Sequence, residues 1–235
     1  MSTGHDSHGA LMDRVYGRQR YFYNLTRRYY LIGRDRLIRG LDLKPGQSLV
    51  EIGCGTARNL ISVARRYPQA RLFGLDASQA MLETANHHVS RAGLGTQIKL
   101  IHGYAESLEP QLFGEIAGFD AAIFSYSLSM IPDWRRALAA ANAAIAPGGR
   151  THIVDFGDLT GLGRIGSAAL RRWLRHFHVE PRAEILHFIE SAGLAESGAN
   201  LWVSPGRYAF IWNGSRFPDG GLANVAGQPQ ADGNS

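Results

Sequence analysis

The residues with the clearest chemical potential are two glycines and two acids near the first strand-like stretch of the chain. Gly53 and Gly55 directly follow the apolar stretch 48–52. Glu51 lies two residues before the first glycine, and Asp76 ends the next apolar stretch. Glycines let the backbone approach a ligand closely, and the start of the following helix offers N–H donors. This arrangement predicts a nucleotide-type cofactor at the carboxyl edge of a parallel sheet.

Two features favour S-adenosylmethionine over a dinucleotide as this cofactor. The carboxylate of Glu51 would oppose a pyrophosphate, but it suits a ligand that carries an ammonium and a sulfonium. Arg58 stands where the dinucleotide motif has its third glycine. Asp76 is placed to bond ribose hydroxyls, which both cofactor classes have. We therefore expect S-adenosylmethionine, with S-adenosylhomocysteine as product, and keep an oxidoreductase as the weaker alternative.

Alternating strands and helices are expected to position these residues. Strands are predicted at 48–52, 72–76, 98–103, 119–124, 151–156, 194–203 and 208–212. Helices are predicted at 58–67, 78–92, 134–145, 168–177 and 183–192. Ser78 is the expected N-cap of its helix, residues 147–149 are expected to close the third helix, and 204–206 predict a tight turn. The pattern indicates an α/β, Rossmann-like, seven-stranded, mostly parallel sheet with a final antiparallel hairpin strand and helices on both faces.

Changes in composition along the chain divide it into four parts. We predict a flexible leader at 1–10, a basic, aromatic helical lid at 11–40, the α/β domain at 41–214 and a disordered tail at 215–235. With 45% hydrophobic and 19% charged residues, most of the chain suits a packed core. No apolar run approaches the ~18 residues of a spanning helix, and the start of the chain does not read as a secretory signal. A single cysteine excludes internal disulfides and fits a reducing compartment.

Four motifs resemble the class I S-adenosylmethionine-dependent methyltransferases over residues 41–213. They are VEIGCGTA at 50–57, GLDAS at 74–78, FDAAIFSYSLSMI at 119–131 and APGGR at 146–150. The sequence departs from the family at Tyr104, where many members carry an Asp that bonds the adenine amino group. Adenine recognition then falls to the backbone of Ala105 or to Glu106.

The resemblance and the motif positions together give a set of candidate cofactor-binding residues. They are Glu51, Gly53, Cys54, Gly55, Arg58, Asn59, Asp76, Ala77, Met81, Ala105, Glu106 and Ser125. Cys54 is expected to be a small packed residue and not a nucleophile. No metal site is expected, because the nine histidines form no His-Glu-x-x-His motif and a second cysteine is absent.

Methyl transfer from a sulfonium needs alignment, exclusion of water and a free lone pair on the acceptor. An amine acceptor must also lose a proton, which Tyr126, or a nearby carbonyl and water, could accept. The rings of Tyr23 and Tyr30 could close over a sulfonium or a methylated ammonium by cation–π contact. These three tyrosines are the candidate catalytic residues.

The segment before the domain is strongly basic. Residues 14–39 hold eight arginines and one acid, a net charge of +7, whereas the whole chain nets +5. Tyrosines and arginines each recur there every seven residues, which is typical of an amphipathic helix at a membrane interface. The candidate residues for anionic lipid head groups are Arg20, Arg27, Arg28 and Arg34. The alternative is a lid helix with solvated arginines; a second basic cluster at 171–178 extends the surface or is an ordinary exposed helix.

Two segments resemble the bacterial diacylglyceryl-homoserine N-methyltransferases of betaine-lipid synthesis. They are YGRQRYFYNLTRRYYLIGRDRLI at 16–38 and SYSLSMIPDW at 125–134. The resemblance implies three successive methylations of a lipid amine to a betaine lipid. It also implies a cytoplasmic enzyme attached peripherally to the inner face of the membrane, with lipid partners.

Other acceptors stay open. A phosphatidylethanolamine N-methyltransferase or a quinone C-methyltransferase would also work at membranes. An RNA methyltransferase is less favoured, because the chain has only two lysines and no recognisable RNA-binding module. A non-catalytic S-adenosylmethionine-binding protein would share the fold, since fold alone does not determine activity. The sequence does not determine the oligomeric state.

Overall fold

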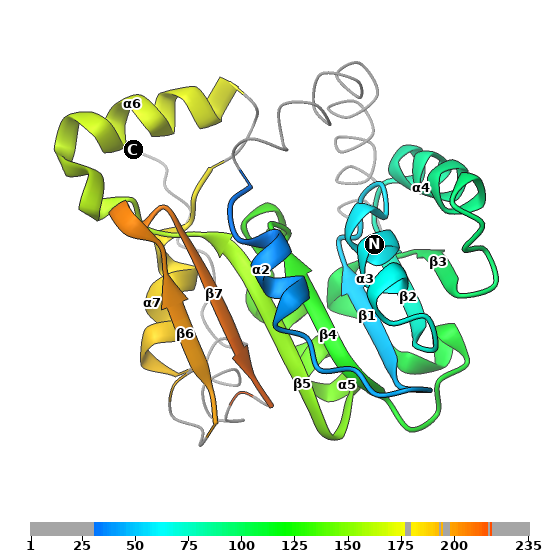
Figure 1. Ribbon diagram of the computed structural model, residues 1–235. Helices are drawn as coiled ribbons and strands as arrows, with labels where there is room; N and C mark the ends of the chain where they lie inside the picture. The colour runs from blue at the N-terminus through cyan, green and yellow to red at the C-terminus, as the bar shows by residue number, and fades with distance from the viewer. Residues whose placement is uncertain (1–30, 177–179, 193, 195–197, 216, 218–235) are drawn as a thin grey trace, which may run out of the picture.

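The computed structural model describes residues 31–176, 180–192, 194, 198–215 and 217. Its centre is a seven-stranded sheet in the order β3-β2-β1-β4-β5-β7-β6 (Figure 1). The strands are β1 (Ser48–Ile52), β2 (Arg71–Asp76), β3 (Ile98–His102), β4 (Phe119–Ser125), β5 (Ile145–Phe156), β6 (Asn200–Val203) and β7 (Ala209–Gly214). Strands β1 to β5 pair in parallel, and β7 runs antiparallel to both β5 and β6. The predicted fold class is confirmed.

Helices cover both faces of the sheet. They are α2 (Arg34–Arg39), α3 (Arg58–Arg66), α4 (Gln79–Arg91), α5 (Trp134–Ala144), α6 (Gly163–His176) and α7 (Ala183–Ser191). Successive residues of β1 face opposite sides, so Leu49 packs with α2, α3 and α4, whereas Val50 packs with α5 and α7. Both are almost fully buried, which explains why the strands lack polar alternation. Among the described helices, none is long and apolar enough to cross a bilayer.

The helix starts follow the expected capping chemistry. Ser78 precedes α4, and its Oγ accepts a hydrogen bond from the amide of Met81 at 3.3 Å, as predicted. Asp133 does the same for α5, with its Oδ1 3.1 Å from the amide of Arg136. These caps fix where each helix leaves the carboxyl edge of the sheet.

Three predicted boundaries are wrong. Strand β5 begins at Ile145 and not at 151, so residues 147–149 belong to the strand. A register shift in the β4–β5 pairing accommodates this stretch. A Cβ on Gly149 would lie 2.8 Å from the carbonyl oxygen of Asp120, so only glycine fits this close backbone approach. Helix α6 starts five residues before the predicted 168, and β6 is shorter than the predicted 194–203.

Several predicted segments lie outside the described residues. They are the leader at 1–10, all of the expected lid helix before residue 31 and nearly all of the tail at 215–235. The described end of the predicted lid contains the short helix α2.

Candidate functional site

Two adjoining hollows open at the carboxyl edge of the parallel strands. A narrow slot of about 90 Å³ runs between the ends of β2 and β4. A wide groove of about 1040 Å³ lies between α2, α3 and the end of β6. Gly53 and Gly55 line both hollows, so the glycine loop forms their common wall.

The backbone of the glycine loop needs its glycines. Both adopt positive φ, +74° at Gly53 and +54° at Gly55. A Cβ on Gly53 would lie 2.5 Å from the Cβ of Ser127, whereas a Cβ on Gly55 would meet only open space. The amides of Gly53 and Cys54 donate to the carbonyl oxygen of Leu75 at 2.8 and 3.0 Å, which pins the loop to β2. The open side at Gly55 leaves the backbone accessible to a ligand.

Asp76 has a structural role in addition to the predicted one. Its Oδ2 accepts from the amide of Gly55 at 2.7 Å, and its Oδ1 accepts from the amide of Ser78 at 2.9 Å. The carboxylate therefore connects the glycine loop to the start of α4. It also lines the slot, where ribose hydroxyls are expected. The ribose contact itself stays a prediction.

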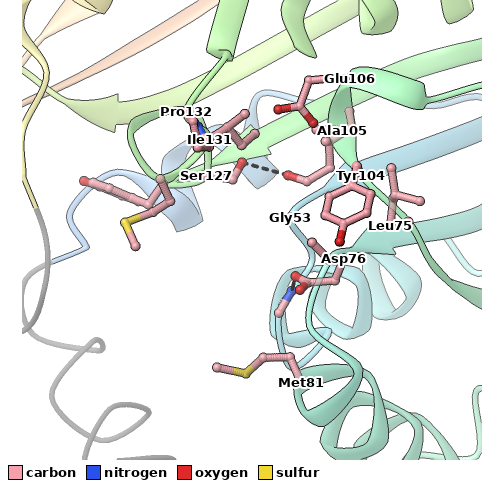
Figure 2. Close-up of a pocket in the computed structure, with 16 residues that line it drawn as sticks. Gly53, Leu75, Asp76, Met81, Tyr104, Ala105, Glu106, Ser127, Ile131 and Pro132 are labelled. Atoms are coloured by element: carbon pink, nitrogen blue, oxygen red, sulfur yellow. Dashed lines mark hydrogen bonds between the residues drawn. The ribbon is translucent and has the colours of Figure 1, made fainter. Parts of the chain in front are cut away.

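The slot has apolar walls suited to a flat aromatic base. Leu75, Met81, Ala105 and Ile131 all line it, and Glu106 stands at its rim (Figure 2). Tyr104 occupies the place where an Asp was expected in many relatives, and its hydroxyl points toward the Asp76 side of the slot in this view. The apolar walls suit the ring of an adenine base, and the polar end at Asp76 suits ribose hydroxyls.

Glu51 provides the test of whether the expected cofactor fits the groove. The side chain is buried on β1, and its Oε1 accepts a hydrogen bond from Nδ2 of Asn59 at 2.7 Å. Its Oε2 is buried and accepts no hydrogen bond from the described residues. Burial raises the pKa of this carboxyl to about 8, although the Asn59 bond and the nearby Arg34 lower it. A cationic ammonium is the partner that this carboxylate lacks, and S-adenosylmethionine carries one.

A chain of polar contacts ties Glu51 to the N-terminal side of the groove. Nη1 of Arg58 donates to Oδ1 of Asn59 at 3.2 Å, and Nη2 of Arg58 donates to Oδ1 of Asp35 at 3.0 Å. The first turn of α3 is thereby linked to α2. Arg58 and Asn59, which are predicted cofactor-binding residues, thus also hold the wall of the groove in place.

The groove is strongly basic. Five arginines line it against two acids, and these charged residues are Arg34, Arg36, Arg39, Arg58, Arg65, Asp35 and Glu51. The guanidinium of Arg36 stacks over the ring of Trp202 at 4.3 Å. Sequence reasoning missed Trp202, because it belongs to β6 and no local motif connects it with residues near position 36. The excess of cations favours an anionic group in the groove.

The structure argues against Tyr126 as the proton acceptor. Its ring is buried, and its hydroxyl donates to the carbonyl oxygen of Ile32 at 2.5 Å. Burial raises the pKa of the phenol well above its ordinary value, so the phenolate that would accept a proton is disfavoured. The side chain instead links the end of β4 to the residues that precede α2. Its backbone has a φ of +56°, which is unusual for a tyrosine.

Cys54 fits the packing interpretation. The thiol is buried, and burial raises its pKa well above the ordinary value, so the reactive thiolate is disfavoured. A Cβ on Gly74 would lie 2.8 Å from its sulfur, which shows how tightly the side chain is enclosed. In the part of the chain that the structure describes, no group of three or more His, Cys, Asp or Glu side chains could hold a metal ion.

The structure brings the predicted cofactor residues together. The slot is lined by Gly53, Gly55, Asp76, Ala77, Met81, Ala105 and Glu106. The groove is lined by Glu51, Gly53, Cys54, Gly55, Arg58, Asn59 and Ser125. Of the residues predicted to contact substrate or lipid, Arg34 lines the groove and Tyr126 lines the slot. The predictions for Tyr23, Tyr30, Arg20, Arg27 and Arg28 lie outside the described residues.

Comparison with known proteins points to one kind of domain. Residues 49–149 match the family model described as "Methyltransferase domain". The chain is 31% identical over 137 residues to a demethylmenaquinone methyltransferase of Geobacillus kaustophilus, covering 58% of this chain and 56% of the relative. It is 30% identical over 131 residues to the enzyme of the same name in Bacillus cytotoxicus, covering 55% and 53%. The chain thus spans about half the length of these relatives. Neither of these two relatives is named as an enzyme of betaine-lipid synthesis.

Solved structures agree on the fold. An O-methyltransferase family protein from Burkholderia thailandensis aligns with a TM-score of 0.62 at 18% identity, covering 83% of this chain and 58% of that one. The S-adenosylmethionine-dependent methyltransferase SibL aligns with a TM-score of 0.60 at 22% identity, covering 83% and 57%. At these identities the likeness bears on the fold alone.

Proposed function

We propose that the protein is an S-adenosylmethionine-dependent methyltransferase that methylates a ring carbon of a quinone-type acceptor related to demethylmenaquinone. The match of residues 49–149 to the model described as "Methyltransferase domain" supports the reaction class. The observation that carries the proposal is the 30–31% identity to enzymes named for that acceptor. Those enzymes match over only part of their length, so acceptor identity is the part that experiment must decide. This acceptor was the alternative in the sequence analysis, and it now takes precedence over lipid amines.

S-adenosylmethionine, when bound, supplies a methyl group activated on sulfur. The chain's own contribution is to bind and orient. Glu51 would hold the ammonium, Asp76 the ribose, and the slot lined by Met81 and Ala105 the adenine. The wide groove beside the glycine loop would take the acceptor and hold it in line with the activated methyl group. A ring carbon of the reduced acceptor would gain the methyl group as the bond from that group to sulfur breaks, which leaves S-adenosylhomocysteine. The proton of that ring carbon would then pass through the open groove to solvent, so no buried base is needed.

One observation supports a second candidate function, which is N-methylation of a lipid amine. The groove has five arginines against two acids, an excess that a neutral quinone does not need. A lipid amine that also carries a carboxylate, such as diacylglyceryl-homoserine, would use such cations. N-methylation of this lipid to its trimethylated form is therefore the alternative that the same assay must include.

The test is methyl transfer by the purified full chain in parallel reactions. Labelled S-adenosylmethionine is offered with reduced demethylmenaquinone, with diacylglyceryl-homoserine or with phosphatidylethanolamine, each in detergent, and products are identified by mass. We expect one methyl group on the quinone ring and none with the Glu51→Gln variant. Mono-, di- and trimethylated homoserine lipid with an unmodified quinone would overturn the proposal in favour of the alternative. Transfer to neither would reject both acceptors.

A further inference from the structure

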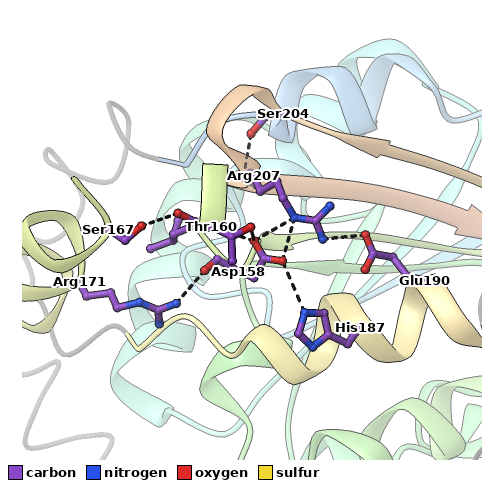
Figure 3. A network of polar contacts seen from close by, with 10 residues as sticks. Asp158, Thr160, Ser167, Arg171, His187, Glu190, Ser204 and Arg207 are labelled. Atoms are coloured by element: carbon purple, nitrogen blue, oxygen red, sulfur yellow. Dashed lines mark hydrogen bonds and ion pairs between the residues drawn. The ribbon is translucent and has the colours of Figure 1, made fainter. Parts of the chain in front are cut away.

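Helix α6 is held firmly to the body of the protein along one side. Leu174 is fully buried on that side. Nη2 of Arg171 donates to the carbonyl oxygen of Asp158 at 2.7 Å, and Oγ of Ser167 donates to the carbonyl oxygen of Leu159 at 2.5 Å (Figure 3). These residues recur at the three- and four-residue spacing of one helix face. The opposite face of α6 is thus presented outward in a defined orientation.

A polar network fixes the loop that precedes α6. The carboxylate of Asp158 accepts from the amide and hydroxyl of Thr160 and from Nε of Arg207 (Figure 3). Arg207 also donates to Glu190 of α7 at 2.7 Å. The network joins the end of β5, α7 and the turn between β6 and β7. The network therefore holds in place the loop from which helix α6 starts.

The outward face carries apolar side chains in a row. Ile165 is 88% exposed and Trp173 is 44% exposed, and exposed Ala169 lies midway between them. Spacings of four residues place the three on one stripe along the helix. Leu162, just before the helix, is 39% exposed and extends the apolar surface. Of the seven large hydrophobic side chains that are exposed in the described part of the chain, three therefore lie on or just before this one helix.

Cations lie along one side of this apolar stripe. Arg164, Arg172 and Arg175 are exposed, and the helix contains no acidic residue. Within the described part of the chain, none of the three forms an ion pair. The predicted basic cluster at 171–178 is thus divided, because Arg171 and Leu174 turn inward while Arg172, Trp173 and Arg175 stay exposed.

We propose that the outward face of α6 docks on an anionic lipid bilayer, with Ile165 and Trp173 entering the interface and the arginines contacting the head groups. An apolar stripe beside unpaired cations is the pattern of an interfacial helix, and its charge is complementary to anionic lipid. The helix follows the carboxyl end of β5, so it lies at the edge of the sheet where the slot and groove open (Figure 1). Docking would bring both hollows to the bilayer surface. The inference goes beyond the proposed function and holds for either acceptor.

The experiment is co-sedimentation of the full chain with vesicles. Vesicles of phosphatidylcholine alone are compared with vesicles that also contain phosphatidylglycerol. We expect binding to the anionic vesicles, and roughly hundredfold weaker binding for the triple variant Arg164→Glu, Arg172→Glu, Arg175→Glu. A second variant, Ile165→Ser with Trp173→Ser, keeps the charge and should also bind more weakly. The matched control is Lys44→Glu, Arg91→Glu, Arg136→Glu, which changes the net charge equally at exposed sites elsewhere.

Cofactor affinity and methyl transfer to a detergent-dispersed acceptor should be unchanged in both α6 variants, which also shows that they fold. Equal vesicle binding by the α6 variants and the wild type would overturn the proposal. So would equal losses in the α6 and control triple variants, because binding would then follow net charge alone. A shift from dimer to monomer without a change in vesicle binding would make α6 a contact between two copies and would also overturn it.

Discussion

At the scale of single residues, we expect the Glu51 carboxyl to couple cofactor binding to the release of a proton. Its pKa of about 8 means that the carboxyl is mostly protonated at pH 7 in the cofactor-free protein. An ammonium bound at the buried Oε2 would favour the ionised form. We therefore expect S-adenosylhomocysteine to release close to one proton on binding at pH 7. It should bind about tenfold more tightly at pH 7 than at pH 6, and about fivefold more tightly again at pH 8.

Isothermal titration calorimetry in buffers of different ionisation enthalpy measures this proton release directly. The matched control is Glu51→Gln, which keeps the acceptor for Asn59 but has no proton to lose. This variant should bind weakly and show the same heat in every buffer. Buffer-independent heat in the wild type would contradict the ammonium contact.

Tyr126 is expected to matter for the connection of α2 and not for proton transfer. The Tyr126→Phe variant keeps the buried ring against Phe156 and removes only the hydrogen bond to Ile32. We expect a loss of about 1 kcal/mol in the free energy of unfolding and faster amide exchange at the start of α2. Urea denaturation and hydrogen exchange measure these two effects. A shift in the pH profile of methyl transfer would instead restore the predicted proton-accepting role.

At the scale of elements, the sequence predicts whatever depends on local pattern. The turn from β1 into α3 was predictable because Gly53, Gly55 and Glu51 lie within five residues. The start of β5 was not, because Gly149 reads as a turn residue until Asp120 of the neighbouring strand is known to approach it. The groove was missed for the same reason: its cations come from α2 and α3, and Trp202 comes from β6.

The polar network around Asp158, which holds the loop before α6, gives a prediction at the scale of elements. The Asp158→Ala variant removes the acceptor of Thr160 and Arg207 in one step. Because Arg207 is partly exposed, the loss should be moderate, about 2 kcal/mol in the free energy of unfolding. Urea midpoints measure it against Asp42→Ala, an exposed aspartate between α2 and β1. Equal midpoints for the two variants would mean that the network does not hold the loop.

At the scale of the whole molecule, three buried groups contribute to the dependence of stability on pH between about pH 4 and pH 8. The pKa of Asp155 is raised to about 6 by burial, and that of Glu51 to about 8. For both acids the folded protein binds protons more strongly than the unfolded chain. Their contribution is fully present below pH 4 and is lost as the pH rises through 6 and 8, respectively. His152 acts oppositely, because burial lowers its pKa to about 4 and stability is gained between pH 4 and 6.5.

Above pH 6.5 only the Glu51 effect remains among these three groups, which makes it measurable. We expect the free energy of unfolding of the cofactor-free protein to fall between pH 7 and pH 8.5. The Glu51→Gln variant should show no such fall and should be more stable than the wild type at pH 8.5, because it buries no charge. Saturating S-adenosylhomocysteine should remove the fall in the wild type by supplying the missing cation. Urea denaturation at the two pH values decides it, and a wild-type stability that rises over this range would mean that Glu51 is already ionised in the empty site. A carboxyl that destabilises the empty fold and is neutralised by its ligand is what a binding site, and not a packed core, would retain.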